Sequence, residues 1–251
     1  MLKSLNRQHT ANDVKKAITM LKSVGIDNIS VDLIYGLPNQ TLALWKETLN
    51  DVMKLEIPHI SLYALTIEEH SQFGRDGIQM MDSELEADLY EYAIQFLEAN
   101  GYEQYEISNF ALPNYASKHN IGYWKYEDFY GIGCGASGKE QHVRYDNEWN
   151  IQNYLEGKRH QEQTFLTKKD EQFEFLMMGL RMAEGISKQV FEKQFHLAFD
   201  DCYRRQVTKL VERKWSVSYT HLSILVKIYC QKIFKLPVYY FIAMYLKMSD
   251  R

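Results

Sequence analysis

Residues 29–41 are the stretch that most constrains how this chain can fold. Residues 29–35 form a short apolar run, rich in β-branched side chains, that ends at Gly36 and Pro38. This pattern predicts a buried strand in a parallel sheet. Successive side chains of a strand point to opposite faces, so Ser30 and Asp32 share one face. A carboxylate in an apolar strand must be paired, hydrogen-bonded or at a solvated mouth, because a lone buried charge is costly. Asp32 is therefore either a ligand-binding group at the carboxyl end of the strand or the residue that ties down the following turn.

Periodic apolar residues on both sides of this strand indicate that strands alternate with helices. Thr10 with Asp13 three residues later, and Ser83 with Glu86, have the spacing of capping boxes at helix starts. The expected helices cover residues 10–25, 41–52 and 83–100, and the expected strands cover residues 29–35, 59–67 and 102–110. Strands separated by helices of this length form βαβ units, so the sheet should be parallel with right-handed crossovers.

The pattern changes in the second half of the chain. Residues 131–138 are rich in glycine but follow no strand-to-helix pattern, which predicts an irregular loop rather than a dinucleotide fingerprint. Helical spacing returns over residues 173–185, and a further helix is expected over residues 187–205. Residues 216–249 contain no acidic residue and no glycine. This tail is an apolar helix, a helix on a membrane surface, or a segment foreign to the rest of the chain.

The composition excludes several classes of function. A net charge of -4 over 251 residues and a pI of about 6.1 provide no basic surface for nucleic acid. The three cysteines, Cys134, Cys202 and Cys230, are far apart and form no C-x-x-C pair, so they predict neither a disulfide framework nor a metal motif. The first residues lack the apolar core of a signal peptide, and no apolar run is long enough to span a bilayer. We therefore expect a cytoplasmic protein that binds no nucleic acid.

Six short motifs occur in the order that one known family shows. The motifs are LNRQHT (5–10), VDLIYGLPNQT (31–41), HISLYAL (59–65), GYEQYEISNFA (101–111), HNIGYW (119–124) and GIGCGAS (131–137). Together they closely resemble the radical S-adenosylmethionine (SAM) proteins of the oxygen-independent coproporphyrinogen III oxidase family, over residues 1–182. The wording of YEISNFA and HNIGYW is more similar to the heme chaperone branch of that family than to the oxidase branch.

The resemblance implies an α/β fold. It would be the second half of a partial (β/α)6 TIM-like radical SAM barrel, followed by a truncated and mainly helical C-terminal region. Residues 1–150 are expected to form the half-barrel with the glycine-rich loop region, residues 151–215 a partial helical domain, and residues 216–251 an atypical tail not native to the family. The other strands, with the cysteine loop that holds the family's 4Fe-4S cluster, are expected to precede Met1.

The resemblance also implies a set of SAM-binding residues. Asp32 matches an aspartate that contacts SAM, and its acceptor oxygens suit an amino or hydroxyl donor. Arg7 matches an arginine whose planar guanidinium suits a carboxylate. Thr66 and Ser137 align more weakly with further SAM contacts, and at Ser137 the chain has Ser-Gly where the family has His-Ser. The alternatives are that Arg7 is an exposed charge and that Thr66 is an ordinary strand residue.

A second implied site is a heme site in the HNIGYW motif. The motif groups an imidazole with aromatic rings, and heme requires an iron ligand and apolar surface. The resemblance assigns His119, Asn120, Tyr123 and Trp124 to this site. A single histidine is also commonly a surface or core residue, so the assignment depends on the resemblance.

The implied function is that of a radical SAM-type heme chaperone. It would bind heme and deliver it to heme-accepting proteins, with peripheral membrane contact through those acceptors left open. One alternative is an oxygen-independent coproporphyrinogen III oxidase, which oxidatively decarboxylates propionate side chains. The other is an inert fragment, because an open half-barrel exposes a sheet edge. No catalytic residue and no metal ligand is assigned within the chain.

Overall fold

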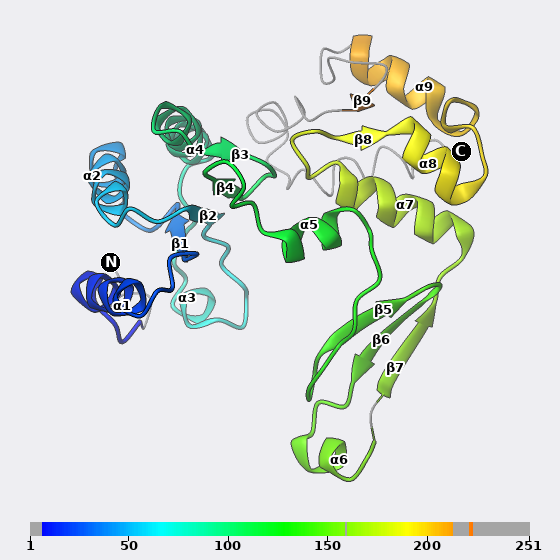
Figure 1. The fold of residues 1–251 in the computed structure, drawn as a ribbon, viewed down its shortest axis with the longest axis horizontal. Coiled ribbons are helices and arrows are strands. Elements are labelled where there is room, and N and C mark those ends of the chain that lie inside the picture. Colours follow the sequence, from blue (N-terminus) through cyan, green and yellow to red (C-terminus); the bar gives the residue numbers. More distant parts are fainter. Residues whose placement is uncertain (1–6, 159, 213–220, 223–251) are drawn as a thin grey trace. The chain divides into compact units, whose positions relative to one another are not determined.

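The computed structural model describes residues 7–158, 160–212 and 221–222 (Figure 1). The described chain divides between Ala116 and Ser117 into two compact units. The first unit contains α1 (Ala11–Ser23), β1 (Ser30–Tyr35), α2 (Leu42–Met53), β2 (His59–Ala64), α3 (Gln72–Arg75), α4 (Ser83–Ala99), β3 (Glu103–Gln104) and β4 (Asn109–Ala111). The second contains α5 (Lys118–Trp124), β5 (Ser137–Glu140), β6 (Val143–Asn147), α6 (Ile151–Leu155), β7 (His160–Phe165), α7 (Lys168–Gly179), β8 (Ile186–Ser187), α8 (Lys188–Phe195), α9 (Phe199–Glu212) and β9 (His221–Leu222).

The first two expected strands and their helices form as predicted. Strands β1 and β2 pair in parallel. Thr10 and Asp13 form a complete capping box at the start of α1, and the Thr41 side chain caps α2. The predicted box at α4 is wrong, because the cap is Asp82, whose carboxylate accepts from the backbone N–H groups of the first turn. Asp82 satisfies the free donors one residue earlier than Ser83 would have done.

The third parallel strand expected from the sequence does not form, which corrects the predicted sheet. Residues 102–110 do not continue as one strand: β3 and β4 form an antiparallel hairpin, and β4 pairs antiparallel with β2. The cause is a turn at residues 105–108, where the Glu106 carboxylate accepts from the Ser108 N–H at 2.8 Å. Local side-chain hydrogen bonds of this kind compete with an extended strand conformation. The chain therefore reverses at this turn, and β4 runs antiparallel to β2. The sheet order is β1-β2-β4-β3.

The apolar face of this sheet packs against helices α2 and α4. Trp45 is fully buried, and its Nε1 donates to the Leu89 backbone carbonyl at 2.9 Å. Tyr35 at the end of β1 lies between Trp45 and Tyr90, with both ring centroids 5.9 Å away. Ile60 on β2 and the other core side chains complete one apolar layer. Because this layer takes one face of β1 and β2, the opposite face carries their polar side chains.

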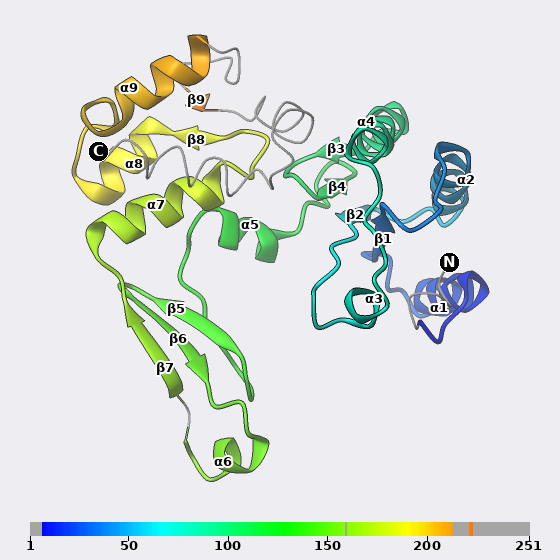
Figure 2. The ribbon, with the colours of Figure 1, turned by 180° about the vertical axis from the view of Figure 1, so that it is seen from behind.

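The second unit contains an antiparallel sheet that the glycine-rich pattern did not predict. Strands β5, β6 and β7 form this sheet, and Figure 2 shows α6 at the end of the sheet away from α7. Tyr145 on β6 lies where a side chain at Gly138 would stand, so the glycine permits the close approach of the two strands. The helix expected over residues 187–205 is interrupted at His196, whose backbone is left-handed (φ 56°) and ends α8.

The sheet of the second unit continues across residue 150, where the sequence placed a domain boundary. The boundaries at 150 and 215 remain predictions about the organisation of the family. Of the atypical tail expected from residue 216, only residues 221–222 lie within the described part, where they pair with β8.

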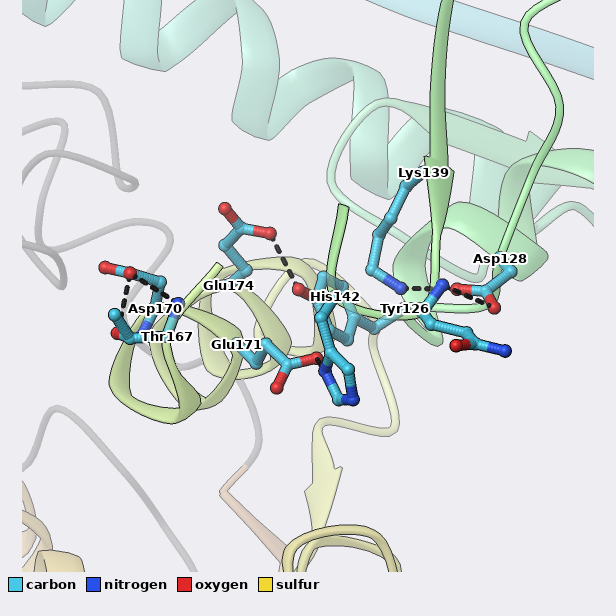
Figure 3. A network of polar contacts seen from close by, with 9 residues as sticks. Tyr126, Asp128, Lys139, His142, Thr167, Asp170, Glu171 and Glu174 are labelled. Carbon is cyan, nitrogen blue, oxygen red and sulfur yellow. Dashed lines mark hydrogen bonds and ion pairs between the residues drawn. The ribbon is translucent and has the colours of Figure 1, made fainter. Parts of the chain in front are cut away.

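A network of charged side chains joins the β5–β6 hairpin to helix α7 (Figure 3). Glu174 on α7 is buried, accepts from the Tyr126 hydroxyl at 2.7 Å and pairs with Arg144 at 2.9 Å. Burial, together with the Glu174 carboxylate, raises the pKa of Tyr126, so its hydroxyl stays protonated and donates. Lys139 pairs with Asp128 at 2.7 Å, and its ammonium also lies 4.1 Å from the centre of the Tyr126 ring.

We predict that Glu174→Ala destabilises the second unit by about 1.5–3 kcal/mol, because it leaves the buried Tyr126 hydroxyl without its charged acceptor. The matched control is Glu184→Ala. The exposed Glu184 carboxylate lies 3.9 Å from Lys125, and its loss should cost less than about 1 kcal/mol. Urea unfolding of the three chains measures the difference. Equal midpoints for the two variants would contradict the role given to Glu174.

Candidate functional site

The polar face of the first sheet is the candidate ligand-binding site. In the parallel register Ser30 lies opposite His59, and Asp32 lies opposite Ser61. In the antiparallel register of β4, Asn109 lies opposite Ser61 as well. Paired residues in a sheet point to the same face, so these five side chains form two adjacent rows on it. Asp32 is exposed, whereas His59, Ser61 and Asn109 are buried.

His59 is held by a hydrogen bond on each ring nitrogen. Its Nδ1 is bonded to the Ser30 hydroxyl at 2.7 Å, and its Nε2 to the Tyr105 hydroxyl at 2.8 Å. Burial lowers the pKa of His59, and the nearby carboxylates of Asp32 and Glu106 oppose that shift only in part. A neutral imidazole has one donor and one acceptor nitrogen, and hydroxyl groups can complement both. His59 therefore links β1 to the turn after β3 as a neutral residue at pH 7.

A buried carboxylate and a buried amide lie beside this histidine. Glu106 is fully buried, and it accepts from the Ser108 N–H and from Asn109 Nδ2. Asn109 is 2% exposed, and among the described residues its Oδ1 has no hydrogen-bond partner. A buried acceptor without a partner costs about 1–3 kcal/mol. The polar face thus contains an acceptor that the described protein does not satisfy.

The four SAM assignments fall in different parts of the chain. Arg7 is exposed just before α1, and Asp32 is exposed on the polar face. Thr66 is exposed two residues after the end of β2. Ser137 begins β5 in the second unit, where its hydroxyl donates to Asp146. Asp32 lies on the polar face, where its carboxylate partly opposes the lowering of the His59 pKa. All four SAM assignments remain predictions.

The four heme assignments lie on α5 and are divided between two of its sides. His119 is exposed, and its ring meets the Tyr123 ring at a centroid distance of 4.7 Å; the Tyr123 ring in turn meets Phe129 at 4.7 Å. Asn120 and Trp124 form the other i, i+4 pair of this short helix. The Arg181 guanidinium lies 4.1 Å from the Trp124 ring. The structure therefore joins His119 with Tyr123 in one row and leaves their role as a prediction.

Sequence reasoning missed His59, Tyr105 and Asn109 as polar-face residues. His59 and Asn109 stand in motifs that were recognised only by their wording, HISLYAL and YEISNFA. The signal that singled out Asp32 also applies to His59 and Ser61, because both are polar residues at alternate positions of an apolar strand. Tyr105 and Asn109 could not be found this way, since the hairpin that places them was not predicted.

The described residues do not fit the ligand set of an iron–sulfur cluster. Among them, Cys134 and Cys202 are both free, and no group of three or more histidine, cysteine, aspartate or glutamate side chains could hold a metal ion. The Cys134 thiol instead donates to backbone carbonyls of residues 148 and 149. Within the same described residues, no helix has the length and apolar character needed to cross a membrane.

Comparisons with known proteins agree with the motifs. The family model of the HemN C-terminal domain matches residues 166–221. The chain is 40% identical to the heme chaperone HemW of Lactococcus lactis, over 85% of this chain and 58% of that protein, and 34% identical to HemW of Haemophilus influenzae, over 86% and 57%. It is also 30% identical to radical S-adenosyl methionine domain-containing protein 1 of Danio rerio, over 76% and 47%. The chain thus spans a little over half the length of these HemW proteins.

The solved structure of coproporphyrinogen III oxidase (HemN) from Escherichia coli, described as a radical SAM enzyme, has the same fold. The TM-score is 0.77 at 17% identity, over 99% of this chain and 61% of that one. The expected fold class, part of a radical SAM barrel with a helical C-terminal region, is confirmed. The chain is thus similar to the HemN-type radical SAM family in fold, and in sequence it is similar to the HemW proteins, as the motifs indicated.

We predict that the neutral state of His59 makes stability depend on pH. Because its pKa is lowered in the folded state, the unfolded chain binds the proton more readily, and stability should fall as the pH drops below about 6.5. The variant His59→Gln keeps a donor and an acceptor but cannot titrate, so its stability should fall less between pH 7 and 5. Denaturant midpoints across this range measure the effect. The exposed-site variant His70→Gln should follow the original chain, and parallel curves for His59→Gln would contradict the prediction.

Proposed function

We propose that this chain binds heme and SAM and delivers heme to acceptor proteins, as a HemW-like protein. The observation that carries the proposal is the row of His119 and Tyr123 on α5, within a region similar to proteins named heme chaperones. The acceptors would be heme-dependent proteins, which leaves peripheral membrane contact through them open. The proposed location is the cytoplasm.

The chemistry of α5 suits heme at its exposed side. The His119 imidazole is exposed and can donate a nitrogen lone pair to iron. Tyr123 packs edge-on against His119 and against Phe129, which holds the imidazole beside an aromatic wall. An exposed site of this kind suits transfer, because a transported group must leave as readily as it binds.

SAM would bind at the polar face of the first sheet. Bound SAM supplies radical chemistry when an iron–sulfur cluster reduces it. The residues of this chain would contribute an acceptor, the exposed Asp32 carboxylate on β1, and a donor, the Arg7 guanidinium, which would pair with the carboxylate of SAM. Thr66, which lies in the same unit, is proposed as a weaker contact. Because no group of described residues fits the cluster, the role proposed for these side chains is to bind and orient SAM.

A second candidate function is supported by the fold alone. The HemN structure that this chain resembles is a coproporphyrinogen III oxidase. The two functions differ in what happens to the tetrapyrrole: a chaperone returns heme unchanged, whereas an oxidase decarboxylates propionate side chains. The greater sequence identity to the HemW proteins favours the chaperone.

We predict that His119→Ala weakens heme binding by roughly tenfold or more, since a lost ligand bond exceeds one ordinary hydrogen bond. Heme titration followed by the Soret band measures both the affinity and the change of iron ligand. The control is His70→Ala, an exposed histidine on the other unit, which should leave the spectrum unchanged. Identical Soret bands for His119→Ala and the original chain would remove His119 from the site.

We predict that Asp32→Asn and Arg7→Gln each weaken SAM binding by roughly ten- to a hundredfold, because each removes a charge-assisted hydrogen bond of about 1.5–3 kcal/mol. Isothermal titration with SAM measures the affinities. Asp27→Asn, an exposed aspartate shortly before β1, is the matched control and should bind as the original chain does. Unchanged affinity in both variants, with circular dichroism intact, would reduce Asp32 and Arg7 to structural residues.

A further inference from the structure

The chain folds back over the last turn of α5. Tyr126 has a left-handed backbone (φ 62°), and its N–H donates to the Tyr123 carbonyl at 3.0 Å. The Glu127 N–H donates to the Gly122 carbonyl at 3.0 Å. These two bonds form a Schellman motif, which brings the residue after the left-handed one against the third residue from the helix end. Glu127 is therefore fixed to α5 through its backbone.

The side chain of Glu127 follows its backbone and lies over Gly122. A Cβ atom at Gly122 would stand 3.0 Å from Glu127 Oε2 and 3.8 Å from its carboxyl carbon. The missing side chain of Gly122 thus leaves the place that the carboxylate takes. Glu127 is exposed, so this carboxylate is open to a ligand that covers the same side of the helix.

His119 lies one helical turn before this carboxylate. It precedes Gly122 by three residues and Tyr123 by four, and Cβ atoms at these spacings are about 5–6 Å apart. At 3.6 residues per turn, Gly122 and Tyr123 lie on opposite sides of the line that runs from His119 along the helix. The Tyr123 ring meets the His119 ring at a centroid distance of 4.7 Å. The imidazole therefore has an aromatic ring on one side and the Glu127 carboxylate on the other.

We propose that Glu127 is a positioning residue of the heme site, whose carboxylate accepts a hydrogen bond from the His119 ring nitrogen that does not bind iron. A histidine that binds a metal commonly donates its other N–H to a carboxylate, which fixes the ring and raises its basicity. Water competes for such a pair while both groups are exposed. A porphyrin over the row excludes that water and strengthens the bond. This role rests on the proposed binding of heme at His119.

The test titrates ferric heme into the 251-residue chain and its variants and follows the Soret band. Glu127→Ala should bind heme roughly ten- to a hundredfold more weakly, the usual cost of losing such a partner. The reduction potential of the bound heme should become more positive, because a carboxylate beside the ligand favours the more highly charged ferric iron. Glu127→Gln keeps an acceptor without the charge, so it should retain part of the affinity and shift the potential in the same direction. Glu98→Ala, an exposed glutamate of the other unit, is the control and should change neither quantity.

The double variant separates this role from that of His119. Once His119→Ala has removed the imidazole, adding Glu127→Ala should change neither the affinity nor the potential. If His119→Ala changes the Soret band but Glu127→Ala leaves the potential unchanged, the role of Glu127 alone is overturned, even where the affinity falls. If His119→Ala leaves the Soret band unchanged, the heme site on α5 is overturned together with this inference.

Discussion

The parallel pairing of β1 with β2 is the interaction on which the candidate site depends. It sets Val31 opposite Ile60 and Leu33 opposite Leu62 on the face that packs against the helices. The same register places Asp32 beside Ser61 on the other face. A slip of one residue would exchange the two faces, so burial of the apolar side chains also determines where the polar ones stand. The core and the site are two consequences of one register.

The residues that complete the polar face come from a reversal of the chain. The turn at Glu106 sends β4 back along β2, which brings Asn109 opposite Ser61. It also carries Tyr105 to His59, forty-six positions away in sequence. Without the turn, a third parallel strand would present a different set of side chains to the same face. The local bonds of one carboxylate therefore decide which groups a ligand at Asp32 would meet.

Periodicity and capping were sufficient to predict β1, β2 and the helices around them, because each of these elements buries one apolar face. They failed for β3 and β4, where side-chain bonds of Glu106 outweigh an extended apolar run. They also misplaced α7, which was expected over residues 173–185 and spans Lys168–Gly179. This helix buries Glu171 and Glu174 against the hairpin, so its inward face is partly polar. The spacing of its apolar residues alone therefore does not mark where the helix begins and ends. The partners of those carboxylates, His142 and Arg144, lie on a different element and leave no local pattern.

The buried carboxylates of the two units have different hydrogen-bond partners. In the second, Glu174 receives a hydroxyl and a guanidinium, so the described contacts match its charge with donors. In the first, Glu106 orients Asn109, and the acceptor at the end of that arrangement is left without a described partner. A folded chain gains nothing in stability from an unsatisfied buried oxygen. Its position on the polar face, two strands from Asp32, is set by the antiparallel register of β4 with β2.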